Sequence, residues 1–163
     1  MRPTSDRLRE TLFNILGASV RDSRFVDLCA GSGAVGIEAL SRGARQAVFV
    51  EQSHRACAVI EANLRALSIT DQANIICCDI IAALKQLAYD AAPFDLIFFD
   101  PPYASGIYST VLSYLGDSAM LAEDGLIVVE HRAKTPPQSD YGRLKMFRQL
   151  KQGESALAFY KAV

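Results

Sequence analysis

The sequence has few of the features that mark membrane, secreted or metal-binding proteins. Of its 163 residues none is tryptophan, two are histidine and four are cysteine. No apolar run approaches the eighteen residues that a membrane-spanning helix needs, and the polar start leads into an amphipathic segment. Export and membrane insertion are therefore not indicated, and we expect a cytoplasmic protein.

The four cysteines lack the spacing of a zinc site. Cys29, Cys57, Cys77 and Cys78 form no C-x-x-C pair and show no ligand spacing with either histidine. We therefore expect no metal ion and predict reduced, mostly buried thiols.

An excess of one charge is also missing. The net charge of −1 gives no overall attraction to polyanions, which excludes a protein that coats DNA through charge alone. The two ends differ from this average: residues 132–163 hold seven basic and two acidic residues, and residues 1–24 hold five arginines and three acids. These ends can form basic patches, or they can be ordinary solvated faces.

Short β-branched or aromatic runs alternate with segments of helical period along the chain. A first helix is expected over Thr4–Ala18, with Leu8, Leu12, Ile15 and Leu16 on one face. The expected strands are Arg24–Cys29, Gln46–Glu51, Ala73–Cys78, Phe94–Phe99 and Gly125–Glu130, and the expected helices are Val35–Arg42, His54–Leu67, Ile80–Tyr89 and Tyr108–Ser118. This alternation predicts an α/β fold with a mostly parallel sheet and helices on both faces.

The last part of the chain breaks this alternation. The loop 134–140 is polar and proline-rich and is expected to be irregular. Two expected strands follow it, Arg143–Leu150 and Ser155–Ala162, joined by a short glycine-containing turn. They should form an antiparallel hairpin at the sheet edge. A seven-stranded sheet that ends in this way resembles the Rossmann-like class I methyltransferases, and we expect one domain over residues 1–163.

A glycine turn joins the first strand to the next helix. Gly31 and Gly33 let the backbone approach a ligand, and the helix N-terminus favours an anionic group such as a methionine carboxylate. The alternative is a mere tight turn. Asp27 can hold water or the ammonium group of the ligand, or it can be an Asx-turn partner of the loop.

Two further strands also end at an acid. Glu51 lies eighteen residues after Gly33, where Rossmann-type sites place an acceptor for ribose hydroxyls; the alternative is a solvated carboxylate. Asp79 can accept a hydrogen bond from an adenine amino group, with Ile80 against the ring, and can also cap the following helix. The residues predicted to bind S-adenosylmethionine are Asp27, Ala30, Gly31, Ser32, Gly33, Glu51, Gln52, Asp79 and Ile80.

The strand Phe94–Phe99 stops at an acid, two prolines and a tyrosine. An exocyclic amine of a nucleobase is a poor nucleophile, so acceptors must draw its N–H groups toward a pyramidal geometry, and Asp100 and the Pro101 carbonyl can do so. Pro101 and Pro102 fix φ near about −65° and donate no N–H, while Tyr103 offers a ring for base stacking. These four residues are the predicted catalytic residues; the alternative is a stiff turn that ends the strand.

Three segments carry a resemblance to a known family. Arg2–Leu16, Ala30–Ala44 and Asp100–Tyr103 are similar to the RsmD-type small-subunit ribosomal RNA guanine-N2 methyltransferases, and the likeness covers essentially the whole chain. DNA adenine methyltransferases share the Asp-Pro-Pro-Tyr motif, so this motif alone does not distinguish adenine from guanine as the substrate. The likeness of the opening helix to the RsmD-type family favours guanine. The resemblance implies methyl transfer from S-adenosylmethionine to N2 of a guanine in 16S rRNA, with ribosomal RNA or the small subunit as partner. We expect a monomer.

The resemblance also implies roles for the start of the chain. Residues 1–20 would lie over the cofactor pocket, with Arg2, Thr4 and Arg7 binding substrate; alternatively, Arg7 and Glu10 are simply an i,i+3 pair. Members usually carry a β-hairpin ahead of this segment, so we expect part of the RNA-binding surface to be missing. His131 is expected to be a packed or solvated imidazole rather than a base.

Three other functions fit part of the pattern. The first is an N6-adenine methyltransferase acting on DNA or RNA, and the second is a non-catalytic nucleotide-binding module. The third is a nicotinamide dehydrogenase, because Gly31, Gly33 and Gly36 have G-x-G-x-x-G spacing. A dehydrogenase would have no use for Asp100–Tyr103.

Overall fold

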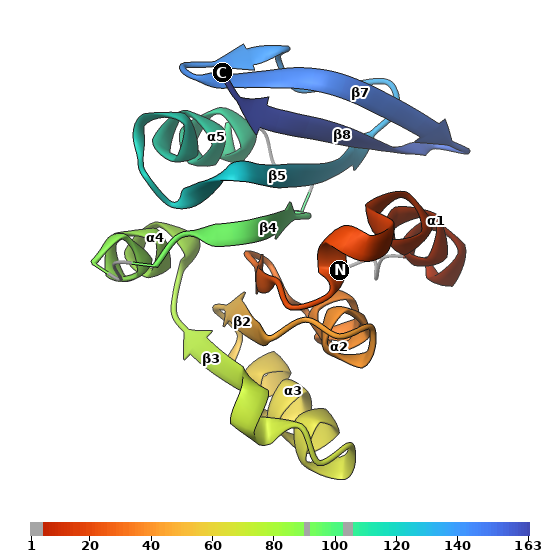
Figure 1. Cartoon of the computed structure of the whole chain (residues 1–163), viewed down its shortest axis with the longest axis vertical. Helices are drawn as coiled ribbons and strands as arrows, with labels where there is room; N and C mark the ends of the chain where they lie inside the picture. The colour runs from red at the N-terminus through yellow and green to blue at the C-terminus, as the bar shows by residue number, and fades with distance from the viewer. Residues whose placement is uncertain (1–4, 90–91, 103–105) are drawn as a thin grey trace.

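The computed structural model describes residues 5–89, 92–102 and 106–163, and it shows a sheet between two layers of helices (Figure 1). The helices are α1 (Asp6–Leu16), α2 (Ala34–Ser41), α3 (His54–Ala66), α4 (Ile80–Ala88) and α5 (Ile107–Asp117), with 3₁₀ turns at Gly17–Val20 and Thr70–Gln72. The strands are β1 (Arg24–Asp27), β2 (Gln46–Glu51), β3 (Ala73–Cys77), β4 (Phe94–Phe99), β5 (Leu121–Arg132), β6 (Asp140–Tyr141), β7 (Leu144–Gln152) and β8 (Ser155–Ala162). No helix in the described ranges is long and apolar enough to cross a membrane.

The strand order is β3-β2-β1-β4-β5-β8-β7-β6. The five strands from β3 to β5 are parallel, and β8 and β7 continue the sheet antiparallel. The chain builds outward from β1 to β3 and then returns to β4 on the other side of β1. Ligands of open α/β sheets bind at such a reversal, so the carboxyl ends of β1 and β4 are the place to look for a site.

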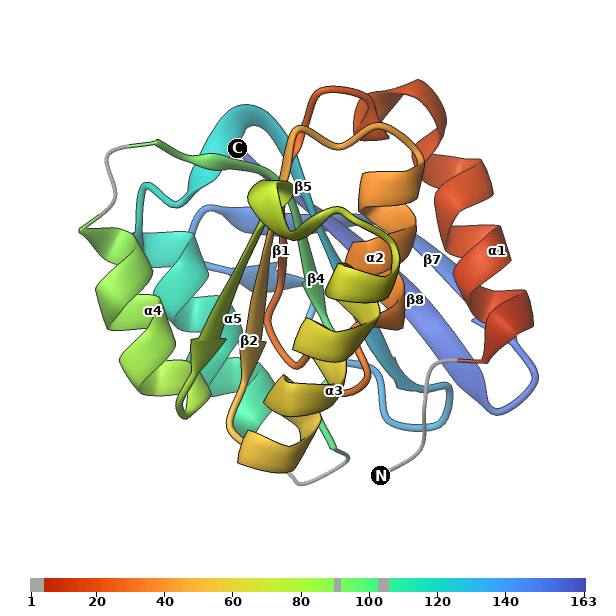
Figure 2. The same ribbon diagram turned by 90° about the horizontal axis from the view of Figure 1, so that it is seen from below.

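Two apolar cores hold the helices against the sheet. One core joins α1, α2 and α3 to one face, and the other joins α4 and α5 to the opposite face (Figure 2). Consecutive residues of β4 show why: Phe98 enters the first core and Phe99 the second, because successive side chains of a strand point to opposite faces. The predicted α/β class with helices on both faces is confirmed.

The first helix differs slightly from its prediction. It begins at Asp6 because the Ser5 side chain accepts a hydrogen bond from the Leu8 backbone N–H at 3.1 Å. Phe13 is buried in the core with α2 and β8, and Ile15 is only half-buried. The buried face of the helix is therefore turned from Ile15 toward Phe13, relative to the face that the periodicity predicted.

The sheet has eight strands rather than the seven expected. The additional strand, β6, lies at the end of the loop expected to be irregular, and the buried ring of Tyr141 holds it against Tyr160 at a centroid distance of 6.0 Å. The Tyr160 hydroxyl also donates to the Gln138 carbonyl at 2.6 Å. β5 begins at Leu121 rather than Gly125, because an irregular register lets Phe94 pair with Leu121.

Candidate functional site

The loop between β1 and α2 is a tight turn stabilised by backbone hydrogen bonds. Gly31 and Gly33 have φ of 57° and 85°, in the left-handed region that favours glycine. The Gly33 N–H donates to the Ala30 carbonyl at 2.8 Å, and the Ala30 N–H donates to the Val50 carbonyl at 2.9 Å. No described side chain caps α2, so its first backbone N–H groups are suited to an anionic ligand group.

Glu51 connects this loop to the next one. Its Oε1 accepts from the Gly31 N–H at 2.8 Å and its Oε2 accepts from the Ser53 N–H at 2.9 Å. The carboxylate is therefore held in place, unlike the solvated carboxylate of the alternative interpretation. Each oxygen keeps a second lone pair, so the same group can still accept hydrogen bonds from two ribose hydroxyls.

Asp27 is a buried carboxylate beside the glycine turn. It is 1% exposed, the backbone amides of Cys29 and Gly36 lie against it, and its Oδ1 has no hydrogen-bond partner among the described residues. Burial, followed by the charges of Glu51 and Glu130, raises its pKa to about 7. A buried acceptor without a partner fits a ligand that brings an ammonium group or an ordered water.

Four acids gather at the carboxyl ends of β2, β1, β4 and β5. Asp27 pairs with Phe49 of β2 and with Phe98 of β4, so Glu51 and Asp100 each lie two residues beyond a partner of Asp27. Burial and then the charges of Asp27, Asp100 and Glu51 raise the pKa of the nearby Cys29 thiol. Phe99 pairs with Val129, so Asp100, which directly follows β4, lies level with Glu130, which is still inside β5. Glu130 was not among the predicted site residues, although an acid at the end of the expected strand Gly125–Glu130 was a usable signal.

The concentration of carboxylates indicates what kind of ligand fits. S-adenosylmethionine carries an ammonium and a sulfonium, both positive, whereas a nicotinamide dinucleotide brings a pyrophosphate with negative charges. Because unit charges at 4 Å interact by about 4 kcal/mol at an effective dielectric constant near 20, the acids favour the first ligand and disfavour the second. The site residues therefore fit S-adenosylmethionine.

The remaining predicted cofactor contacts lie around these acids. Asp79 caps α4, since its side chain accepts from the Ala82 N–H at 3.0 Å; the predicted cap is confirmed and the adenine contact stays a prediction. Ile80 is half-buried against the core on the α4 side. Ala30 is buried, while Ser32 and Gln52 are exposed on the two loops.

The predicted catalytic residues follow β4 directly. Asp100 is half-buried, Pro101 is buried and Pro102 is exposed, whereas Tyr103 lies outside the described residues. A second aromatic residue, not predicted, is Tyr108 of α5. Its ring packs edge-on against Phe99 at 5.8 Å, and its hydroxyl donates to the Glu130 carbonyl at 3.3 Å, which ties α5 to the ends of β4 and β5.

The start of α1 holds the predicted substrate residues. Arg2 and Thr4 lie outside the described residues, and Arg7 is exposed. Arg9, which the sequence analysis did not single out, pairs with Glu38 at 3.2 Å and with Asp6 at 3.1 Å. This interaction attaches α1 to α2, the helix that follows the glycine turn.

The histidine and cysteine predictions have mixed outcomes. His131 is 1% exposed, its Nδ1 lies 2.7 Å from the Arg132 carbonyl, and burial lowers its pKa, so it is a packed imidazole.

The four thiols are free, but Cys57 alone is buried and the other three are half-buried, so the prediction of mostly buried thiols was wrong. Cys77 is the last residue of β3, an edge strand of the sheet, and Cys78 follows it, so these two thiols are only partly covered.

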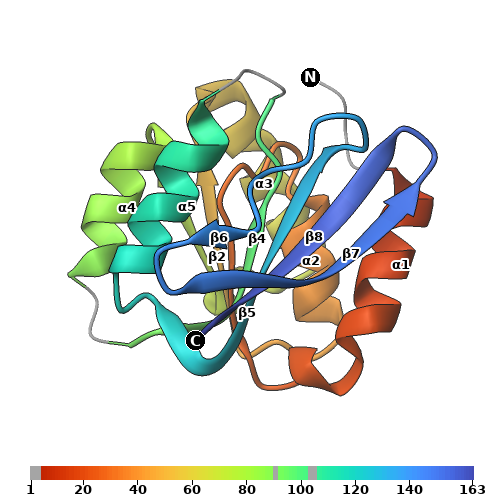
Figure 3. The ribbon, with the colours of Figure 1, turned by 90° about the horizontal axis from the view of Figure 1, so that it is seen from above.

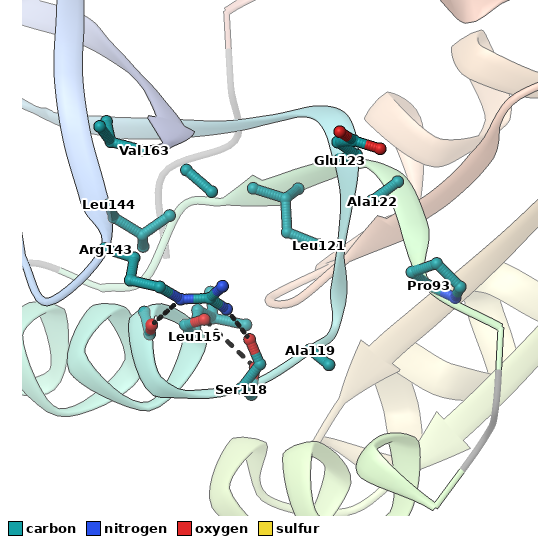
Figure 4. Close-up of a pocket in the computed structure, with 12 residues that line it drawn as sticks. Pro93, Leu115, Ser118, Ala119, Leu121, Ala122, Glu123, Arg143, Leu144 and Val163 are labelled. Atoms are coloured by element: carbon teal, nitrogen blue, oxygen red, sulfur yellow. Dashed lines mark hydrogen bonds between the residues drawn. The ribbon is translucent and has the colours of Figure 1, made fainter.

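A cavity of about 500 Å³ lies at the opposite end of the sheet (Figure 4). Arg143 reaches into it and donates to the carbonyls of Gly116 at 3.4 Å and Ser118 at 3.0 Å. These are carbonyls at the C-terminal end of α5 that lack helical partners, so the arginine has a structural role there. The cavity is lined by the amino ends of β4 and β5 and is far from Asp27 and Glu51.

Comparison with known proteins identifies the family. The family described as Conserved hypothetical protein 95 matches residues 1–161. The chain belongs to this family. The putative rRNA methyltransferase YlbH of Bacillus subtilis is 38% identical over 98% of the chain and 87% of its own length. Ribosomal RNA small subunit methyltransferase D of Escherichia coli is 33% identical over 99% of the chain and 79% of its own length.

Solved structures agree with this assignment. The putative methyltransferase yhhF from Escherichia coli superposes with a TM-score of 0.87 at 31% identity, over 99% of this chain and 88% of that one. An RNA methyltransferase from Salinibacter ruber in complex with S-adenosyl-L-homocysteine shares the fold, with a TM-score of 0.74 at 14% identity. The resemblance and the class I methyltransferase fold inferred from the sequence are confirmed.

The raised pKa of Asp27 leads to a prediction about stability. Between pH 4 and 7 the folded protein holds a proton on Asp27 that the unfolded chain releases, so this residue makes the free energy of unfolding fall as pH rises to about 7. Asp27→Asn should therefore raise the free energy of unfolding by about 1–3 kcal/mol at pH 8 and by much less at pH 4.5. Urea unfolding at both pH values measures this, and an equal change at both would contradict it.

Proposed function

We propose that the chain is an S-adenosylmethionine-dependent methyltransferase that methylates the exocyclic N2 amine of a guanine in small-subunit ribosomal RNA. The observation that carries the proposal is the register of three strands: β1 pairs Asp27 with Phe49 and with Phe98, which brings Glu51 and Asp100 close to Asp27, and Glu51 accepts from the Gly31 N–H of the glycine turn. It puts the acid of the Asp-Pro-Pro-Tyr motif next to the residues suited to the cofactor. The names of the relatives, rRNA methyltransferases from two bacteria, support the RNA substrate.

Each residue of the site has a defined task in this proposal. Glu51 accepts hydrogen bonds from the ribose hydroxyls, Asp27 faces the ammonium group, and the first amides of α2 face the carboxylate. The cofactor, when bound, supplies a methyl group on a positively charged sulfur. Asp79 and Ile80 take the adenine ring, and the proposed contacts of Ala30, Ser32 and Gln52 are to the same ligand.

The acceptor amine is prepared by the residues after β4. Asp100 and the carbonyl of Pro101 accept its two N–H bonds, which turns the nitrogen lone pair toward the methyl carbon. Proximity and orientation of this kind can contribute roughly 7–11 kcal/mol to a reaction that needs three atoms in line. The proton that leaves the amine passes to Asp100 or to water. Tyr103 is proposed to stack on the target base.

Further parts of the proposal concern the surroundings of the site. Residues 1–20, including Arg2, Thr4 and Arg7, are proposed to cover the cofactor and meet RNA phosphates. Displacement at a sulfonium needs no Lewis acid, so activity should survive a metal chelator. We also propose a single-domain monomer that works in the cytoplasm, where ribosomal RNA and small subunits are available as partners.

The identity of the product tests the proposal. The protein is incubated with labelled S-adenosylmethionine and protein-free small-subunit rRNA, immature small subunits or DNA, and the product is digested to nucleosides. N2-methylguanosine from RNA is the expected label. Recovery of N6-methyladenosine alone would establish the adenine alternative, and tight binding of NAD without binding of S-adenosylmethionine would exclude the methyltransferase class.

A further inference from the structure

The two long strands of the C-terminal hairpin have an unusual charge composition. β7 and β8 together contain four basic residues, Lys145, Arg148, Lys151 and Lys161, and no acidic residue, although the chain as a whole has a net charge of −1. Lys145 lies 3.5 Å from Asp140. No described carboxylate lies within ion-pair distance of Arg148 or Lys161.

A β-bulge brings an aromatic ring and a cation to the same face. Met146 pairs with Tyr160 and Arg148 pairs with Phe159, so Phe147 is the additional residue between two successive pairs. As a result both Phe147 and Arg148 contact Phe159: the two rings are 6.4 Å apart, and the guanidinium lies 5.9 Å from the Phe159 ring. The Lys161 ammonium lies 5.2 Å from the Phe147 ring.

The helices leave this part of the hairpin uncovered. α1 reaches the turn end, where Thr11 donates to the Gln152 side chain at 3.1 Å (Figure 3). Further along the hairpin, Phe147 is 47% exposed and both Arg148 and Lys161 are exposed. We name Phe147, Arg148 and Lys161 the hairpin surface.

We propose that the hairpin surface is a second contact for the substrate RNA, in which a base stacks on Phe147 and phosphates pair with Arg148 and Lys161. Two cations beside one exposed ring are complementary to nucleic acid, since every base has a stacking face and every nucleotide a negative charge. The inference rests on the proposed RNA substrate and adds where that RNA lies on the protein.

The hairpin surface is close enough to the catalytic residues for one RNA molecule to contact both. The register places Phe98 of β4 opposite Val128 of β5, and Val128 opposite Phe159 of β8. Phe159 in turn lies opposite Arg148 of β7, and Asp100 follows Phe98 by two residues. With strands about 4.8 Å apart and a rise of about 3.3 Å per residue, Arg148 and Asp100 are roughly 16 Å apart. A separation of this size is spanned by a few nucleotides, so one RNA molecule can reach both places.

A double charge reversal tests the hairpin surface. Arg148→Glu combined with Lys161→Glu should weaken binding of protein-free small-subunit rRNA by at least about tenfold at 0.15 M salt and raise KM for RNA, with little change in kcat. The slope of log affinity against log salt should fall by about 1.4, or about 0.7 for each lost contact to a single strand. Phe147→Ala should weaken binding by about tenfold, and Phe147→Tyr should restore it.

The matched control carries the same change of net charge elsewhere. Arg45→Glu combined with Lys85→Glu alters two exposed bases on the loop before β2 and on α4, and it should leave RNA affinity within about twofold. Cofactor affinity, measured by calorimetry, should be unchanged in all variants and shows that they are folded. Arg148→Gln combined with Lys161→Gln offers a milder version of the same test.

The possible results separate the two proposals. If the wild-type protein forms N2-methylguanosine in rRNA while the hairpin variant binds RNA as tightly as the control variant, the hairpin surface is refuted and the proposed function stands. A loss of activity on assembled subunits without weaker binding of protein-free rRNA would refute RNA contact in favour of a ribosomal protein. If the wild-type protein methylates no RNA, the proposed function itself fails.

Discussion

Asp100→Ala should lower the rate of methyl transfer by about 10²–10³-fold while changing the affinity for S-adenosylmethionine by less than about threefold. In the proposed reaction the carboxylate accepts an N–H bond of the amine, and removal of one positioned hydrogen-bonding group from a reaction centre typically costs this much. In the proposed function Glu51 and Asp27 hold the cofactor without a contact from Asp100, so binding and catalysis should separate. Single-turnover methylation with both substrates saturating, together with calorimetry, measures the two quantities.

The other end of the same strand offers a control. Asp95 accepts a hydrogen bond from the Arg24 backbone N–H at 2.8 Å at the amino end of β4. Asp95→Ala should lower the free energy of unfolding by about 1 kcal/mol and leave the rate of the folded enzyme within about threefold. Asp100→Asn keeps one acceptor oxygen and should fall between wild type and Asp100→Ala. Full activity of Asp100→Ala would contradict the role assigned to the acid.

The fold could be predicted from the sequence to the extent that it depends on local pattern. The alternation of apolar strands with amphipathic helices predicted the five parallel strands, and the glycine-containing turn after Leu150 predicted the hairpin. Strand β6 could not be predicted in this way, because its two residues are held by the contact of Tyr141 with Tyr160, nineteen positions away. The early start of β5 likewise depends on the partner strand, through the pairing of Leu121 with Phe94.

The site was predictable in composition and less so in arrangement. Gly31, Gly33 and Glu51 could be found from their spacing, because a glycine turn and the next strand end are neighbours in any sheet of this topology. The pKa of Asp27 is raised first by its burial and then by the charges of Glu51 and Glu130, and Glu130 lies more than a hundred residues later. The bulge at Phe147 has no local sequence signal, since it arises from the register between β7 and β8.

Glu51→Ala should weaken the binding of S-adenosylmethionine by about 100-fold or more. The side chain is proposed to supply the acceptors for the ribose hydroxyls, and hydrogen bonds to a charged group contribute about 1.5–3 kcal/mol each. The Gly31 and Ser53 amides also lose their acceptor, so the glycine turn becomes less ordered before the ligand arrives. Calorimetric titration of the cofactor measures the change in Kd.

The same substitution on the next helix provides the comparison. Glu61 of α3 is exposed and pairs with Arg65 at 2.8 Å, an interaction of little energetic consequence at the surface, so Glu61→Ala should bind the cofactor as wild type does. A high concentration of cofactor should bring the rate of Glu51→Ala close to that of wild type, because in the proposed function the amine is still oriented by Asp100. No concentration of cofactor should restore the rate of Asp100→Ala. If Glu51→Ala keeps the wild-type Kd, the carboxylate serves only to join the two loops, and the ribose must be held by other groups.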